Sequence, residues 1–321
     1  MKKTAALLCA AMIFLLCFTG CKNEKSAPES ERLSIVATMF PQYDFCREIC
    51  AGTADITLLL PPGVESHSYD PTPADILKIV NCDVFIYTGP EMETWAQSIL
   101  AGVGSDVTVI DLSQCVELIA DCHDDDCEDE HDEDHDHEHE HHGHHHTYDP
   151  HIWTSPKNAE SMTRRITETL CVLSPENSNL YLENCESYCG KLDGLDSEFM
   201  NISENAVSRT IVFGGKFSFG YFTEQYGFDW TAAYDSCSHE SEPSVGKVAE
   251  LIDYVRENNV SAVYYEELTN PTVARTIARE GGAEIRLLHS CHNVSKDELD
   301  SGVTYLSIME NNVKNLREGL C

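Results

Sequence analysis

Short apolar runs alternate with amphipathic segments along most of this chain. The runs are four to six residues long, as in strands buried on both faces, and the segments between them have apolar positions at helical spacing. At one helix start, Thr72 provides a capping hydroxyl, Pro73 occupies the first helical position and Asp75 stands three residues after the cap. The first half predicts strands over 34–39, 56–60, 84–87 and 107–111, and helices over 42–50, 72–81 and from 89 onward.

The second half repeats the alternation. It predicts strands over 210–214, 229–233, 262–266 and 284–288, helices over 218–226, 244–258 and 271–280, and a closing helix that ends near Leu320. Strands that alternate with helices form parallel sheets covered by helices. The sequence therefore predicts an α/β protein with two lobes, 33–173 and 207–321.

The segment between the two lobes has the pattern of one long helix. A Ser-Pro-Glu helix start at 174–176 is followed by apolar residues at alternating steps of four and three over 181–199. About thirty residues of helix extend roughly 45 Å, which is enough to cross two lobes. We predict a linking helix over 174–206, and a helical hairpin broken at Gly190 or Gly194 is the alternative.

The N-terminus has the pattern of an export signal. Two lysines precede an apolar run over 5–18 that is too short for a stable transmembrane helix and leads into Phe-Thr-Gly-Cys at Cys21. This predicts a bacterial lipoprotein signal over 1–20, a lipid anchor on Cys21 and a polar tether over 21–32. Phe18 stands where such signals usually have Leu, and an ordinary signal peptide is the alternative. We expect an exported protein, anchored to the outer face of the cell membrane.

Charge narrows the class of partner. The formal net charge is −34, and so acidic a chain attracts cations and not the phosphates of nucleic acid. Residues 121–146 interleave thirteen acidic residues with ten of the fifteen histidines. Solubility does not require histidine, so we expect this tract to contact metal and to be disordered without it, in preference to a merely solvated acidic insert. Its HExxH spacing lacks the apolar helix that a zinc protease needs.

The cysteine content suits an oxidising compartment. Apart from Cys9, Cys17 and the anchor Cys21, twelve cysteines remain, an even number. Sequence alone does not give their pairing. Cys237 and Cys291 are the first pair to test, because each lies beside a candidate ligand loop.

Candidate ligands lie in loops that follow predicted strands, and open parallel sheets bind their ligands beyond the carboxyl ends of the strands. In the first lobe His67 and His151 each stand among turn residues, and these matching contexts favour both as metal ligands. In the second lobe the loops hold Lys216, His239 and the His-Ser-Cys-His sequence 289–292.

Several motifs together resemble one family. They are Pro61-Pro62-Gly63 through Asp75, Gly89 to Glu93, the acidic histidine run, Asp149 to Trp153, Phe219 to Phe222 and Glu242-Pro243-Ser244. The chain after the tether is similar to the zinc and manganese solute-binding lipoproteins of ABC transporters. The resemblance implies two Rossmann-like lobes with parallel sheets, joined by one long backbone helix, and a metal ion in the cleft between them. It also implies an ABC transporter permease as the partner, and we expect the chain to act as a monomer.

The resemblance implies His67 and His151 as the first-lobe ligands. The second lobe departs from the family pattern, because Lys216 stands where His or Glu is usual and His289 where Asp is usual. An ammonium has no lone pair for a metal and repels a dication. We therefore expect His289 as the third ligand and His239 or water as the fourth. Such a nitrogen-rich tetrahedral shell favours Zn²⁺ over Mn²⁺.

The leading hypothesis is capture of Zn²⁺ outside the cytoplasm and its delivery to the permease, without an enzymatic step. Manganese uptake is the alternative within this class. Two other classes are a zinc-dependent hydrolase, for which Glu65 is the nearest first-lobe base, and a metal-buffering adhesin that binds through the tract.

Overall fold

Each lobe is built on a parallel sheet of four short strands. The computed structural model describes residues 32–120, 148–234 and 243–321. In the first lobe the strand order is β2-β1-β3-β4. The strands are β1 Ser34–Ala37, β2 Asp55–Leu58, β3 Val84–Tyr87 and β4 Thr108–Asp111. The two central strands, β1 and β3, are almost entirely buried, which explains why they read as continuous apolar runs.

The second lobe repeats this topology with the strand order β6-β5-β7-β8. The strands are β5 Thr210–Phe213, β6 Asp229–Ala232, β7 Ala262–Tyr265 and β8 Glu284–Leu287. In both lobes the second strand pairs with one side of the first strand and the third strand with the other. The loops at the carboxyl ends of such strands are the ones that bind ligands.

The predicted helices between the strands are present, one of them with a later start, and the structure adds two that were not predicted. Before the linking helix they are α2 Phe40–Cys50, α3 Pro73–Val80, α4 Ala96–Leu100 and α5 Pro156–Leu173, and after it α7 Gly220–Tyr226, α8 Val245–Glu257, α9 Thr272–Gly281, α10 Lys296–Asp300 and α11 Tyr305–Leu320. Of these, α5 and α10 were not predicted. The helix expected from residue 89 begins only at Ala96. The Glu93 carboxylate accepts the backbone N–H groups of Thr88 and Gly89 at 3.1 Å, so this segment forms a turn.

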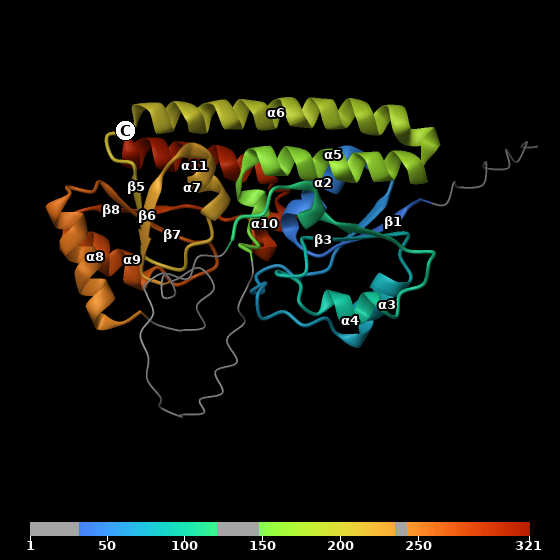
Figure 1. The fold of residues 1–321 in the computed structure, drawn as a ribbon, viewed down its shortest axis with the longest axis horizontal. Coiled ribbons are helices and arrows are strands. Elements are labelled where there is room, and N and C mark those ends of the chain that lie inside the picture. Colours follow the sequence, from blue (N-terminus) through green and yellow to red (C-terminus); the bar gives the residue numbers. More distant parts are fainter. Residues whose placement is uncertain (1–31, 121–147, 235–242) are drawn as a thin grey trace, which may run out of the picture. The chain divides into compact units, whose positions relative to one another are not determined.

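The linking helix is α6, Ser178–Asn205, and it continues unbroken through Gly190 and Gly194. Both glycines are exposed, and the buried residues of α6 lie on its opposite face. Helix α6 packs against α2 and α5 and also against α7 and α11, so it contacts helices of both lobes (Figure 1). The predicted architecture of two parallel α/β lobes with one long helix is confirmed.

The lobes share a continuous core. One buried cluster includes Phe45 of the first lobe and Phe213 of the second. Polar contacts cross the same boundary: the Asp44 carboxylate accepts the N–H of Tyr305 at 2.7 Å, and the Tyr305 hydroxyl donates to the carbonyl of Trp153 at 2.7 Å. The loops at this boundary are therefore held by both lobes.

Two further expectations concern export. Among the described helices, none combines the length and apolar character needed to cross a membrane. The cysteines of the described ranges form no disulfide bonds with one another, and they include the buried Cys291. The predicted partner Cys237, the anchor Cys21 and the tract 121–146 lie outside the described residues.

Candidate metal-binding site

The first candidate ligand, His67, lies in the loop after β2. The Glu65 carboxylate accepts the N–H groups of His67 at 3.0 Å and Ser68 at 2.9 Å, which shapes the turn that carries the imidazole. The same loop is bound to the second lobe, because Gly63 N–H donates to the carbonyl of Val294 at 2.9 Å. His67 itself is exposed, so a metal ion can reach this side of the site from solvent.

The second candidate ligand, His151, is fully buried before the short helical turn Ile152–Thr154. Its Nδ1 lies 2.6 Å from Asp149 Oδ1, which also accepts the His151 backbone N–H at 2.9 Å. Burial acts to raise the pKa of the Asp149 carboxyl, but the neighbouring His151 imidazole lowers that pKa below its usual value. Asp149 is therefore a carboxylate that accepts the Nδ1 proton and leaves Nε2 available as a ligand atom.

Close packing places Asp149 against the second lobe. The Tyr221 hydroxyl donates to the Asp149 carbonyl at 2.9 Å. Gly220, at the start of α7, lies so near that a Cβ there would stand 2.2 Å from Asp149 Oδ2. Only glycine permits this approach between α7 and the residue that orients His151.

The third imidazole of the cluster belongs to His292, in the loop after β8. Its ring centroid is 4.7 Å from that of His151 and 5.4 Å from that of His67. The Nε2 atoms of His67 and His151 are 3.2 Å apart. Each of the three residues offers a ligand atom within 4.8 Å of the other two, so one cation can contact all three.

A carboxylate from the second lobe adjoins this cluster. Glu266 follows β7, and its Oε1 lies 3.5 Å from His292 Nδ1. Burial acts to raise the pKa of Glu266, but its contacts with His292 and the charge of His151 lower that pKa, which favours the anion. Glu266, Glu267 and His292 form a second overlapping group of possible ligand atoms. Glu266 thus lies beside His292, but it is not in the group formed by His67, His151 and His292.

His289, the expected third ligand, is placed elsewhere. It is buried, and its backbone N–H donates to Asn312 Oδ1 of α11 at 2.9 Å. Its ring Nδ1 accepts the backbone N–H of Cys291 at 3.0 Å. Burial lowers its pKa to about 4. It belongs to neither group of possible ligand atoms in the described ranges. The structure therefore differs from the expectation, with His292 next to His67 and His151 in place of His289.

The backbone explains this exchange. Cys291 has φ 64°, a left-handed conformation that is rare for a residue with a side chain. It turns the chain between the two histidines, and the His292 ring then lies beside the rings of His67 and His151. Sequence reasoning had identified the loop but had no signal for this turn. His239, the other expected donor, lies outside the described residues.

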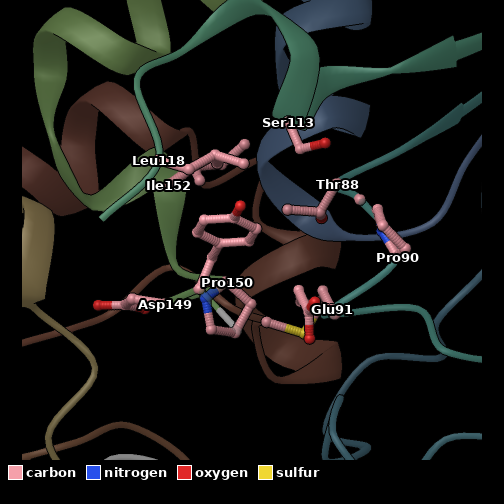
Figure 2. A pocket seen from close by; sticks show the side chains of 11 residues that line it. Thr88, Pro90, Glu91, Ser113, Leu118, Asp149, Pro150 and Ile152 are labelled. Carbon is pink, nitrogen blue, oxygen red and sulfur yellow. The ribbon is translucent and has the colours of Figure 1, made fainter. Parts of the chain in front are cut away.

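A separate pocket lies behind the His151 loop (Figure 2). Its lining is largely apolar, with Pro90, Leu118, Pro150 and Ile152 among the lining residues and no histidine. In Figure 2 the Asp149 carboxylate points away from this cavity, in keeping with its hydrogen bond to His151. The cavity therefore adds no imidazole to the metal cluster.

Two parallel α/β lobes bridged by a long helix, with imidazoles from both lobes meeting between them, define a metal-binding receptor of the solute-binding class. The chain belongs to the family of the zinc-uptake complex component A, periplasmic, whose model matches residues 35–319. This membership confirms the resemblance seen in the sequence motifs.

Individual relatives agree with this assignment. The high-affinity zinc uptake system protein ZnuA of Bacillus subtilis (strain 168) is 33% identical over 99% of this chain and 98% of its own length. The metal-dependent lipoprotein YcdH of Bacillus subtilis has a crystal structure that matches with a TM-score of 0.75 and 31% identity over 90% of this chain and 99% of that one. The Zn(II)-bound ZnuA-like domain of Streptococcus pneumoniae AdcA matches with a TM-score of 0.73 and 27% identity over 90% and 99% of the two chains.

Proposed function

We propose that this protein captures Zn²⁺ outside the cytoplasm and delivers it to an ABC-type permease. The observation that carries the proposal is the meeting of His67, His151 and His292, which offer ligand atoms within 4.8 Å of one another. The family and the zinc-binding relatives support it. Zn²⁺ is the cargo of this site and not a catalytic cofactor.

The donor set favours zinc over manganese. Three imidazoles and one carboxylate, from Glu266, suit a tetrahedral Zn²⁺ site, whereas Mn²⁺ prefers shells rich in oxygen. The four proposed ligands are His67, His151, His292 and Glu266. In this assignment His289 supports the loop through its contacts with Asn312 and Cys291.

The arrangement gives no support to a hydrolase. Glu65, the nearest first-lobe base considered from sequence, accepts the backbone N–H groups of its own turn. A hydrolytic zinc site needs an open coordination position and a base directed at it. A binding function is therefore the better interpretation.

We also propose that the mature protein is anchored through a lipid on Cys21. The Phe-Thr-Gly-Cys sequence and the name of the lipoprotein relative support this. Anchoring keeps the receptor near the permease after the signal over 1–20 is removed. Mass spectrometry of the membrane fraction would detect diacylglyceryl on Cys21, and Cys21→Ala would release the protein.

Single substitutions test the ligand assignment. His67→Ala, His151→Ala and His292→Ala should each weaken the tight Zn²⁺ site by more than about 100-fold, because loss of a ligand exceeds the 10- to 100-fold cost of losing a supporting contact. Glu266→Gln should weaken it by at least about 10-fold. Competition with a chromogenic chelator measures the tight site in the full mature chain.

The two histidines of the β8 loop provide the matched control. His289→Ala should reduce Zn²⁺ affinity far less than His292→Ala, because the His289 ring accepts the Cys291 N–H and is not in the group formed by His67, His151 and His292. Loss of tight binding in His289→Ala with normal binding in His292→Ala would refute the proposed ligand set. Equal tight binding in all variants would refute the site.

A further inference from the structure

Ser290 links His292 to a second buried carboxylate. Its hydroxyl contacts His292 Nδ1, and its Oγ also lies 2.5 Å from Glu267 Oε1. The Ser290 N–H donates to Glu267 Oε2 at 2.7 Å. Both oxygens of Glu267 thus meet Ser290, one through the backbone and one through the side chain.

The protons available to Glu267, Ser290 and His292 determine which group donates in each hydrogen bond between them. A serine hydroxyl has one proton and two lone pairs. In its ionised form, which both contacts with Ser290 favour, Glu267 accepts that proton, and the Ser290 oxygen then has only lone pairs left for His292. His292 Nδ1 must then carry the proton and donate it to Ser290, and Nε2 keeps its lone pair. Nε2 is buried and has no hydrogen-bond partner in the described part of the chain.

We propose that Ser290 and Glu267 are positioning residues that hold His292 as its Nδ1–H tautomer and direct the Nε2 lone pair at the metal. This inference rests on the proposed function, since it concerns one ligand of the same site. It gives the second lobe the device that Asp149 supplies to His151 in the first lobe, with a hydroxyl inserted between imidazole and carboxylate.

Several contacts that do not involve the Ser290 side chain hold the backbone of this loop. The indole N–H of Trp153 donates to the Ser290 carbonyl at 2.7 Å, and Trp153 is fully buried. Asn293 donates through its side chain to the carbonyls of Pro61 at 2.8 Å and Val64 at 2.9 Å. Ser290→Ala removes one backbone contact, the His292 N–H donated to Ser290 Oγ at 3.3 Å. The contacts of Trp153 and Asn293 remain and should keep the loop against the first lobe.

Ser290→Ala tests the inference, with Ser290→Thr as the rescue, because threonine retains the hydroxyl. Ser290→Ala should weaken tight Zn²⁺ binding by roughly 10- to 100-fold, as expected for loss of a partner that orients a ligand, and Ser290→Thr should restore most of it. Ser203→Ala, which removes a buried hydroxyl that donates to Tyr226 far from the cluster, is the control and should leave Zn²⁺ affinity unchanged. Binding is measured by chelator competition in the full mature chain.

Long-range ¹H–¹⁵N spectra of the zinc-free, histidine-labelled protein report the tautomer directly. The His292 signals, assigned by their loss in His292→Ala, should show a protonated Nδ1 in wild type and in Ser290→Thr, and a mixture of tautomers in Ser290→Ala. A purely structural role for Ser290 would leave these signals unchanged.

The outcomes separate the two proposals. A protonated Nε2 in the wild type, or unchanged Zn²⁺ affinity in Ser290→Ala while His292→Ala loses binding, would overturn the positioning role and leave the proposed function intact. Unchanged binding in His292→Ala would instead contradict the ligand assignment on which the inference rests.

Discussion

At the scale of single residues, the site depends on which ring nitrogen each histidine leaves for the metal. Asp149 is hydrogen-bonded to Nδ1 of His151, and Ser290 to Nδ1 of His292. The Nε2 atoms of both rings therefore remain available as ligand atoms. We therefore expect Asp149 and Ser290, which the proposed site does not place on the metal, to affect Zn²⁺ affinity.

Gly220 offers a test of that dependence. Gly220→Ala would place a Cβ 2.2 Å from Asp149 Oδ2 and force the carboxylate or α7 to move. We expect a loss of about 1–3 kcal/mol in the free energy of unfolding and weaker Zn²⁺ binding. Chemical denaturation and chelator competition measure the two effects.

Gly190→Ala is the matched control. Nothing lies within 4 Å of a Cβ at this exposed position of α6. Alanine in a helix interior should raise the free energy of unfolding by about 0.5–1 kcal/mol and leave Zn²⁺ affinity unchanged. A destabilised Gly190→Ala, or a Gly220→Ala with normal zinc binding, would contradict the structure.

Glu93 makes stability depend on pH. Burial raises its pKa from 4.5 to about 7, despite hydrogen bonds from Thr38, Thr88 and Gly89 that favour the anion. The folded state therefore holds a proton that the unfolded state releases between about pH 4.5 and 7. Through Glu93 alone, the free energy of unfolding is highest below pH 4.5 and falls as pH rises through 7, by on the order of 3 kcal/mol.

Glu93→Gln should remove this contribution. The stability of the variant minus that of the wild type should increase from pH 4.5 to pH 7.5, measured by urea denaturation of the zinc-free proteins. A difference that stays constant over this range would show that Glu93 does not change its protonation on folding.

At the scale of elements, local sequence patterns determined where most of the helices and strands form. The Thr72 cap and its Asp75 partner form the predicted capping box at the start of α3, because both interactions lie within one turn. The buried stripe of α6 keeps it helical through two glycines, because packing along the whole helix exceeds their local cost of about 1 kcal/mol each. The helix predicted from residue 89 begins only at Ala96, and the Glu93 carboxylate accepts the N–H groups of Thr88 and Gly89 in the turn before it.

At the scale of the whole molecule, the metal cluster is assembled by loops of two lobes that bind each other. Trp153 holds the Ser290 carbonyl, and Asn293 holds the His67 loop through Pro61 and Val64. The donors of this cluster therefore converge through contacts among the described residues. We expect this cluster, and not the histidine tract over 121–146, to be the tight site.

Deletion of residues 123–146 should therefore leave one tight Zn²⁺ event and remove a set of weaker ones. Isothermal titration of the deleted and full chains at the same pH distinguishes the two sets. If the deletion abolished the tight event, the tract and not the cluster of His67, His151 and His292 would be the principal site.

The sequence by itself determined the α/β class, the long helix and the family, and it predicted the pair His67 and His151, because each depends on a periodic pattern or on residues close together in the chain. It also predicted the β8 loop as a source of ligands. Only the tertiary structure shows that His292, and not His289, lies beside His67 and His151, because that placement depends on the left-handed turn at Cys291. Glu266 and Ser290 likewise acquire their proposed roles from contacts between separate loops, and such contacts leave no local signal in the sequence.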